Sequence, residues 1–356
     1  MRNILASLLF LVAFSVNAQD EHQEADSHSE KPDIKTEIKE YIDHHLLDSY
    51  DFTLYSYDTD EGEHKYIGFP LPVILIDNGL QVFSSSKFHH GESVAEHNGN
   101  YYAIDHNKIY KTDAAGTIHY DDAHHATNEK PLDFSITKNV FFIMIIGLFM
   151  IWIFVRMGKK YQKGMPTGLG RFLEPIILYI RDDIALPNIG EKHYRKYMSY
   201  LLTVFFFVWI VNLLGLTPVG INVTNNIAVT FALALITYLL TTFTANKNYW
   251  KHIFWMPGVP APMKIILAPI ELLGTFIKPF SLMIRLYANI TAGHIVLMSI
   301  IGLMFIFKNW IGSSLSFTLA IMLSMLELLV AALQAYIFTM LSALYFGMAV
   351  EEHDDH

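Results

Sequence analysis

The stretch Phe280-Ser281-Leu282-Met283-Ile284-Arg285-Leu286-Tyr287-Ala288-Asn289-Ile290-Thr291-Ala292-Gly293-His294 places one arginine, one amide and one histidine inside an apolar run. From Pro279 to Phe307, Arg285 is the only residue with an obligatory charge. A guanidinium cannot be neutralised in a protein, so at membrane depth it costs several kcal/mol unless it faces protein or water. The stretch therefore predicts a membrane-embedded helix with a functional arginine.

Composition divides the chain into two unlike parts. Of its 356 residues, 52% are hydrophobic, which is typical of a membrane protein. Residues 19–135 hold 24 Asp and Glu against 8 Lys and Arg, a net charge of −16, whereas the rest of the chain holds 10 and 17, a net charge of +7. With no cysteine, the chain has no disulfide and no thiolate chemistry. An acidic domain joined to membrane-embedded segments is expected.

The first 18 residues have the pattern of a secretory signal peptide. Arg2 supplies a positive start, residues 4–14 form an apolar core, and Val16-Asn17-Ala18 is a small-residue cleavage site. The alternative is a short additional transmembrane helix, but the apolar core is too short to span a bilayer. Residues 19–40 are charged and poor in aromatic residues, which favours a disordered acidic tail. If the signal is cleaved, residues 19 to about 135 lie outside the cytoplasmic membrane.

Residues 41–135 are predicted to form a small, partly β extracytoplasmic domain with an acidic surface. Two apolar runs, residues 73–76 and 80–83, flank Asn78-Gly79, and a second pair, Asn98-Gly99, precedes the aromatic run at 101–104. An Asn-Gly pair between apolar runs is the strongest short signal for a β-hairpin. Two hairpins are expected in this domain.

Histidine is concentrated before the predicted membrane segments. Of 17 histidines, 12 precede residue 126, among them His44-His45, His89-His90 and His124-His125. Two interpretations stay open, a metal site and a solvated acidic surface. Adjacent histidines in a strand point to opposite faces, and no His-x-His or Glu-x-x-His set accompanies them. We favour the surface, and we assign no metal ligand and no cofactor.

Residues 136–356 are predicted to form an all-α polytopic membrane domain. Its five apolar segments are residues 139–155, 197–216, 227–244, 279–307 and 311–350. Basic residues directly after the first segment, including Lys159, Lys160 and Lys163, indicate its cytoplasmic end. Residues 172–185 are amphipathic, which predicts a helix lying at the interface.

The last two apolar segments are longer than the roughly 20 residues that a bilayer needs. We therefore expect a strongly tilted helical hairpin whose two arms meet at Lys308-Asn309.

Helical spacing sorts the polar residues of the last two segments. At about 100° per residue, Glu271, Lys278 and Arg285 are seven apart and share one stripe, with Asn289 one turn further on. His294 is nine residues beyond Arg285, about half a turn round and about 13 Å along the axis. In the last segment Glu327 and Gln334 are again seven apart.

These stripes predict two polar paths that meet near Arg285, one from Glu271 and one around His294 and Glu327. In the alternative interpretation, Glu271 and Lys278 extend to the interface, and His294 and Glu327 bond only to neighbouring groups.

The motifs resemble subunit a of the F-type ATP synthase. The resemblance rests on Ile270-Glu271-Leu272-Leu273, on Arg285-Leu286-Tyr287-Ala288-Asn289 followed by Ala292-Gly293, and on Leu333-Gln334-Ala335. Asn212-Leu213-Leu214-Gly215-Leu216 and Glu351-Glu352-His353 match as well. The resemblance covers residues 135–353 in order and with matching spacing, and it does not reach the acidic domain.

The resemblance implies a role for each polar residue. Arg285 would be the stator arginine that faces the rotating ring of c subunits and blocks a direct proton leak. Asn289, Gln334 and Asn212 would accompany it, and Glu271 and Lys278 would belong to the cytoplasmic half-channel. His294 and Glu327 would belong to the other half-channel, where many bacterial members carry the acid first and the histidine second. The reversed order here implies an exchange between the two helices.

The same resemblance implies a non-catalytic subunit. Its expected partners are the c-ring, the b subunits of the peripheral stalk, the remaining synthase subunits and membrane lipids, and no nucleic acid. The chain has no Gly-x-x-x-x-Gly-Lys-Ser/Thr loop for nucleotide phosphates. A proton-coupled secondary transporter or an ion channel is the main alternative, since both also carry intramembrane ionisable residues. Transporters commonly contain internal repeats, and none is evident in the sequence. The sequence leaves proton against sodium coupling open.

Overall fold

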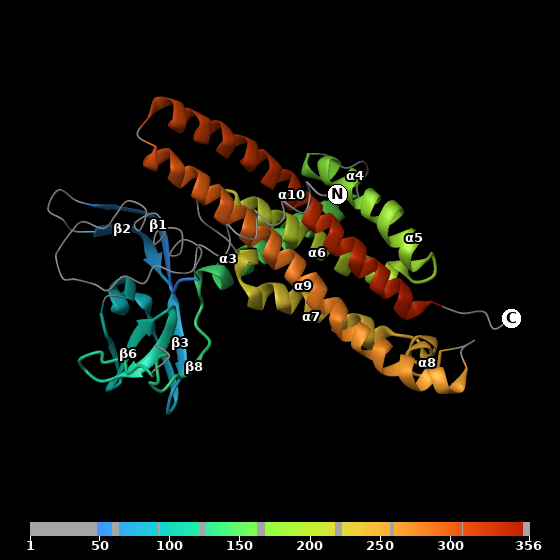
Figure 1. The fold of residues 1–356 in the computed structure, drawn as a ribbon, viewed down its shortest axis with the longest axis horizontal. Coiled ribbons are helices and arrows are strands. Elements are labelled where there is room, and N and C mark those ends of the chain that lie inside the picture. Colours follow the sequence, from blue (N-terminus) through green and yellow to red (C-terminus); the bar gives the residue numbers. More distant parts are fainter. Residues whose placement is uncertain are drawn as a thin grey trace, which may run out of the picture. The chain divides into compact units, whose positions relative to one another are not determined.

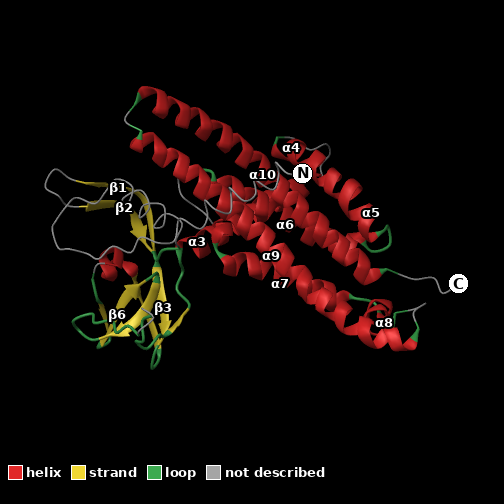
Figure 2. Cartoon of the chain, in the orientation of Figure 1, coloured by secondary structure: helices red, strands yellow, loops and turns green. Residues whose placement is uncertain are grey.

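The computed structural model describes residues 48–58, 64–91, 93–121, 125–161, 168–217, 223–256, 260–307 and 309–351. The predicted signal peptide, the predicted acidic tail and some single predicted positions lie outside these ranges: His44, His45, His124, Lys163, Lys308, Glu352 and His353. Figure 2 shows the strands gathered in one part of the chain and the long helices in another.

The described residues between 48 and 135, called the strand region below, contain three small antiparallel sheets with the strand orders β1-β2, β4-β3-β8 and β5-β6-β7. Their strands are β1 (Asp51–Asp58), β2 (His64–Pro70), β3 (Pro72–Ile76), β4 (Leu80–Ser84), β5 (Ala95–His97), β6 (Asn100–Asp105), β7 (Lys108–Thr112) and β8 (Leu132–Asp133). A short helix, η1 (Ser85–Gly91), follows β4 and contains His89 and His90. The fully buried side chains Val73, Leu75, Phe88 and Tyr102 lie in one apolar core.

Both predicted hairpins are confirmed. β3 pairs with β4 across Asn78-Gly79, and β5 pairs with β6 across Asn98-Gly99. Every one of these four turn residues has a positive φ, from 49° at Asn78 to 129° at Gly79. Asparagine and glycine tolerate that conformation, and paired positive φ values match the twist of a tight hairpin.

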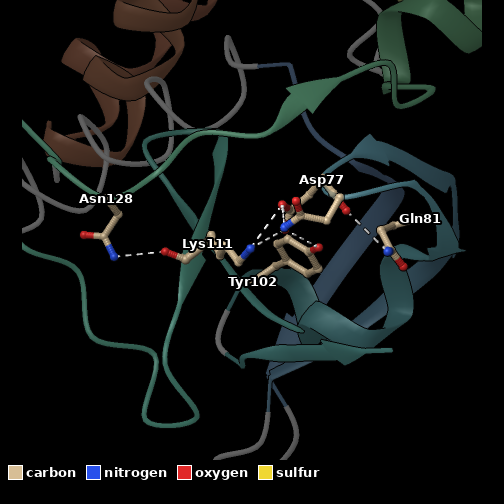
Figure 3. A network of polar contacts seen from close by, with 6 residues as sticks. Asp77, Gln81, Tyr102, Lys111 and Asn128 are labelled. Atoms are coloured by element: carbon tan, nitrogen blue, oxygen red, sulfur yellow. Dashed lines mark hydrogen bonds and ion pairs between the residues drawn. The ribbon is translucent and has the colours of Figure 1, made fainter. Parts of the chain in front are cut away.

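A buried ion pair links the sheets of the strand region (Figure 3). The Lys111 ammonium lies 2.8 Å from Asp77 Oδ2, and the Tyr102 hydroxyl donates to the same oxygen at 3.0 Å. The hydrogen bond from Lys111 is the main cause that holds the pKa of Asp77 below its ordinary value. Burial raises the pKa of Tyr102 to about 12. The carboxylate in the core is thus fully partnered, as a buried charge requires.

Among the residues that the structure describes, five helices are long and apolar enough to cross a membrane, as the sequence predicted. Figure 1 shows the last two running alongside each other. The helical elements in chain order are α3 (Lys138–Tyr161), α4 (Leu169–Tyr179), η2 (Ile180–Ala185), α5 (Leu186–Ile189), α6 (Tyr194–Gly215), η3 (Val223–Asn225), α7 (Ile227–Thr244), α8 (Lys247–Phe254), α9 (Ala261–Ile306) and α10 (Trp310–Val350).

Helix α9 is longer than predicted. The predicted segment began at Pro279, whereas the helix begins at Ala261 and continues for 46 residues through Pro269 and Pro279. A proline lacks an amide donor and crowds the preceding turn, but helices packed in a membrane domain tolerate it because their neighbours supply support. Here α7, α8 and α10 pack against α9. Tertiary packing therefore outweighed the two prolines and the charges at Glu271 and Lys278.

Helix α10 forms the centre of the helical part, where it packs against both α6 and α9. The rings of Tyr197 on α6 and Phe346 on α10 stack with centroids 4.4 Å apart. The amphipathic segment predicted at 172–185 is helical, as α4 continued by the wider turn of η2. Ile180 and Ile184 are fully buried in the same core as α6 and α10.

Candidate functional site

A cavity of about 300 Å³ lies between α6, η3, α9 and α10. The polar side chains that line it, which define the Glu327 cavity, are Asn212, Thr224, Asn289, His294, Glu327 and Gln334. All but Asn289 are buried. The remaining lining residues are mostly apolar, and a space of this size is large enough for several water molecules beside the polar groups. Such a cavity can conduct protons between carboxylate, imidazole and water.

Glu327 packs directly against the backbone of the neighbouring helix. A methyl group built on Gly293 would lie 3.0 Å from Glu327 Oε1 and 3.7 Å from its carboxyl carbon. Within the described part of the chain, neither carboxyl oxygen has a hydrogen-bond partner. Leaving an ionised carboxylate buried without a partner is costly, which distinguishes Glu327 from the partnered Asp77 of the strand region. The absence of a side chain at Gly293 is what lets Glu327 reach this position.

The end of α6 supplies the other wall. The Thr224 hydroxyl donates to Asn212 Oδ1 at 3.0 Å, which ties η3 to α6. The Thr291 hydroxyl of α9 donates to Asn225 Oδ1, which ties the same short helix to α9. Buried hydroxyl and amide groups need such partners to offset their lost hydration. The segment 223–226 is thereby held over the cavity.

A second cavity, of about 190 Å³, lies between α8, α9 and the end of α10. Its polar lining, which defines the Glu271 cavity, includes Tyr249, His252, Glu271, Thr275, Lys278 and Glu351. The Lys278 ammonium lies 5.5 Å from the ring centroid of Tyr345, on the face of α10. This cavity thus gathers two carboxylates, a lysine and a histidine, all of which can exchange protons with water.

Arg285 lines neither cavity. Along α9 it follows Lys278 by seven residues and precedes Asn289 by four, or about 10 Å and 6 Å of helix axis. Its side chain is half-buried. No carboxylate in the described ranges lies within salt-bridge distance of the guanidinium. Among these residues, the arginine thus presents an unpaired positive charge between the two cavities.

The structure brings the sequence-predicted residues into two groups and leaves one apart. Asn212, Asn289, His294, Glu327 and Gln334 share the first cavity, Glu271 and Lys278 share the second, and Arg285 belongs to neither. Across the described residues, no group of three or more His, Asp or Glu side chains could hold a metal ion.

Sequence reasoning missed part of both cavities. Thr224 carries no signal of its own in the sequence, because its place at the cavity wall depends on a contact with Asn212. Tyr249 and His252 lie on α8, a helix that the sequence pattern did not indicate. The available sequence signal for Tyr249 and His252 was that they are polar residues just after the apolar segment 227–244.

Comparisons with known proteins divide the chain at the same point as the composition. Residues 140–347 match the family model described as ATP synthase A chain. Residues 41–134 match a separate model, Domain of unknown function (DUF8433).

Individual relatives agree with that match. The chain is 42% identical over 233 residues to ATP synthase subunit a of Chloroherpeton thalassium, covering 63% of this chain and 69% of the relative. It is 43% identical over 234 residues to ATP synthase subunit a 2 of Chlorobaculum tepidum, covering 63% and 66%. With ATP synthase subunit a of Pelodictyon phaeoclathratiforme the identity is 40% over 279 residues, covering 75% and 80%.

Proposed function

The chain belongs to the family of subunit a of the F-type ATP synthase, a proton-translocating membrane subunit, and on that premise we propose that its two cavities are the two half-channels of the proton path. The observation that carries this proposal is the order of polar groups along α9. Glu271 and Lys278 belong to one cavity, Asn289 and His294 to the other, and Arg285 lies between them.

The Glu327 cavity is the half-channel that opens to the outer side of the membrane. Glu327 and His294 take protons from that side and pass them toward Asn289 and Gln334, which line the same cavity. Asn289 is four residues from Arg285 on α9. Glutamate and histidine exchange protons near neutral pH when their surroundings adjust them. Asn212 contributes an amide at the wall of this path.

The Glu271 cavity is the half-channel that opens to the cytoplasm. Glu271 receives or releases protons there, and Lys278 sets a positive potential at the inner end of the path. The cavity includes Glu351 at the end of α10, so carboxylates flank the exit.

Arg285 separates the half-channels. A fixed cation repels a proton in transit, and it attracts the ionised carboxylate of a c subunit that passes it. Its guanidinium has no carboxylate partner within the described chain and is therefore available to a group on the ring. Each proton then crosses the membrane only while it is bound to a c-subunit carboxylate that rotates from one cavity to the other. One charge crossing the membrane gains about 2.3 kcal/mol per 100 mV, which a leak past Arg285 would dissipate.

The same proposal extends to the arrangement in the cell. Residues 1–18 direct export, residues 19–40 are an acidic tail, and residues 41–135 form an extracytoplasmic domain, with the C-terminus of the membrane domain in the cytoplasm. At 1.5 Å per residue, the 46 residues of α9 span about 69 Å, so this helix and α10 lie strongly tilted in a core of about 30 Å. Their shared face meets the c-ring, and the b subunits and lipids contact the remaining apolar faces. The subunit has no nucleotide site of its own.

Replacing Arg285 by alanine tests the proposal. In inverted vesicles that contain the assembled complex, we expect Arg285→Ala to abolish ATP-driven proton pumping while the c-ring and soluble subunits still copurify. Normal pumping by this variant would contradict the role of Arg285 as the barrier between the two half-channels. Copurification with the c-ring and soluble subunits also excludes the transporter alternative, because a transporter purified in detergent would be a monomer or a homo-oligomer without those subunits.

A further inference from the structure

A short segment that begins with η3 forms one wall of the Glu327 cavity. Thr224 in η3 lines the cavity, and the next residues lead directly into α7. Asn226 is the N-cap of α7, since its Oδ1 accepts a hydrogen bond from the Ala228 amide at 3.0 Å. The other half of its side chain, the Nδ2 amide group, points to a different partner.

That partner is Asp48, which lies shortly before β1. Asp48 Oδ2 accepts a hydrogen bond from Asn226 Nδ2 at 3.3 Å, and Asp48 Oδ1 accepts one from the backbone amide of Asn139 at 3.1 Å. Asn139 lies in the first turn of α3, where amides have no partner inside the helix. One carboxylate therefore joins the amino ends of α3 and α7, where a negative charge is favourable.

The strand region holds Asp48 in this place. The Asn107 side chain, in the turn between β6 and β7, donates to the Asp48 carbonyl oxygen. The ring of Phe52 in β1 contacts that of Phe142 in α3 at 5.2 Å between centroids. The backbone carbonyl of Ser49 also accepts the Lys138 amide at 2.9 Å. Polar and aromatic contacts thus connect the strand region to the start of α3.

We propose that Asp48 is a positioning residue for proton entry: through Asn226 it holds the segment 223–226 against α9, so that Thr224 and Asn212 keep their places at the cavity wall. The strand region then supports the outer half-channel structurally. The inference rests on the proposed function only in identifying the Glu327 cavity as that half-channel.

The Asp48–Asn226 pair permits a test by exchange. Asp48→Asn alone turns an amide group toward the Asn226 amide group, and Asn226→Asp alone opposes two carboxylates. In the double variant Asp48→Asn/Asn226→Asp, the donor and acceptor trade places and the hydrogen bond forms again. Aspartate caps a helix as well as asparagine does, and the amide oxygen introduced at position 48 can still accept the Asn139 backbone amide, so side-chain volume and capping are retained.

Two readouts are taken, the first on the complete complex and the second on membrane vesicles from which its soluble subunits have been removed. Hydrogen exchange reports opening of residues 223–226, and passive proton flow through vesicles stripped of the soluble subunits, normalised to c-ring content, reports conduction. Loss of a hydrogen bond to a charged group is expected to speed exchange of this segment by about tenfold. We expect each single variant also to reduce proton flow several-fold, and the double variant to restore both readouts to within about twofold of the parent.

Asp113→Asn is the matched control. Its carboxylate binds only locally, accepting from the Thr117 amide at 2.8 Å and hydroxyl at 2.9 Å, so neither readout should change. The proposal is overturned if both single variants conduct normally, or if the double variant is no better than the single ones. A Glu327→Gln variant separates the two proposals, because normal proton flow there would refute the half-channel assignment and leave the exchange result standing.

Discussion

Gly293 offers the sharpest test of how the Glu327 carboxylate is positioned. The methyl group of Gly293→Ala would sit 3.0 Å from Glu327 Oε1 and 3.7 Å from both the Cδ and Cγ atoms. An oxygen and a methyl carbon at 3.0 Å repel each other, so Glu327 must move by a few tenths of an ångström. The cavity of about 300 Å³ beside it gives the carboxylate room to do so.

The expected magnitude follows from the cost of overpacking. Extra carbon atoms in a packed site cost about 1–3 kcal/mol, and larger groups cost more. If the small displacement of Gly293→Ala raises the barrier of the proton-transfer step by about 1 kcal/mol, the rate falls about fivefold. Gly293→Leu cannot be accommodated by a small shift, and we expect a loss of about 100-fold or more.

The assay is ATP-driven acidification of inverted vesicles, normalised to assembled complex. Gly274→Ala is the matched control, because it makes the same change in the same helix and, apart from its own stretch of helix, no atom lies within 4 Å of its added methyl group. Both substitutions gain the same helix propensity, up to about 1 kcal/mol. Equal pumping by the two alanine variants, at the parent rate, would refute the contact between Gly293 and Glu327.

Three further predictions concern partnered polar groups. Lys111→Met leaves Asp77 as an unpaired buried charge, so the strand region should lose about 3 kcal/mol of stability, measured as roughly 100-fold faster limited proteolysis of the full chain in detergent. The hydrogen bond from Lys111 is the main cause that lowers the pKa of Asp77 in the folded state, so the stabilisation from Asp77 should be complete above pH 3.8 and lost as the pH falls through that lowered pKa. The pKa of Tyr102 is raised instead, so its stabilisation should be complete below pH 10.0 and lost as the pH rises toward about 12. Near-ultraviolet circular dichroism of the full chain measures both transitions. Thr224→Val removes the donor to buried Asn212 and should cost about 1–3 kcal/mol in thermal unfolding of the complex.

Each of these has a contradicting result. Unchanged proteolysis of Lys111→Met would show that the ion pair contributes nothing to the strand region. A dichroism signal that is flat from acid to alkaline pH would refute the roles of Asp77 and Tyr102. A Thr224→Val complex as stable as the parent would mean that the hydroxyl is not needed at the cavity wall.

Most of the fold could be predicted from local signals in the sequence. The five apolar segments are evident from their length, and the two Asn-Gly turns are evident because two adjacent residues determine them. The start of α9 could not be predicted in this way. Pro269, Glu271 and Pro279 resemble the end of a helix, and only packing against α7, α8 and α10 keeps the helix continuous.

The candidate site was predictable where residues share one helix and unpredictable where helices meet. The seven-residue spacing of Glu271 and Lys278 placed both on one face, and both line one cavity. The contact of Glu327 with Gly293 joins two helices, and Asp48 bonds to Asn226, 178 residues away. No periodicity within a segment encodes a contact of that kind.

The two cavities should open to opposite sides of the membrane, with Arg285 between them. Because the chain has no cysteine, any label on this subunit reports the introduced thiol alone, and Thr275→Cys and Val330→Cys place one thiol in each cavity. A membrane-impermeant thiol reagent is added to either side of vesicles that contain the complete complex. We expect Thr275→Cys to react only from the cytoplasmic side and Val330→Cys only from the outer side. Reaction of both thiols from the same side would contradict the two half-channels.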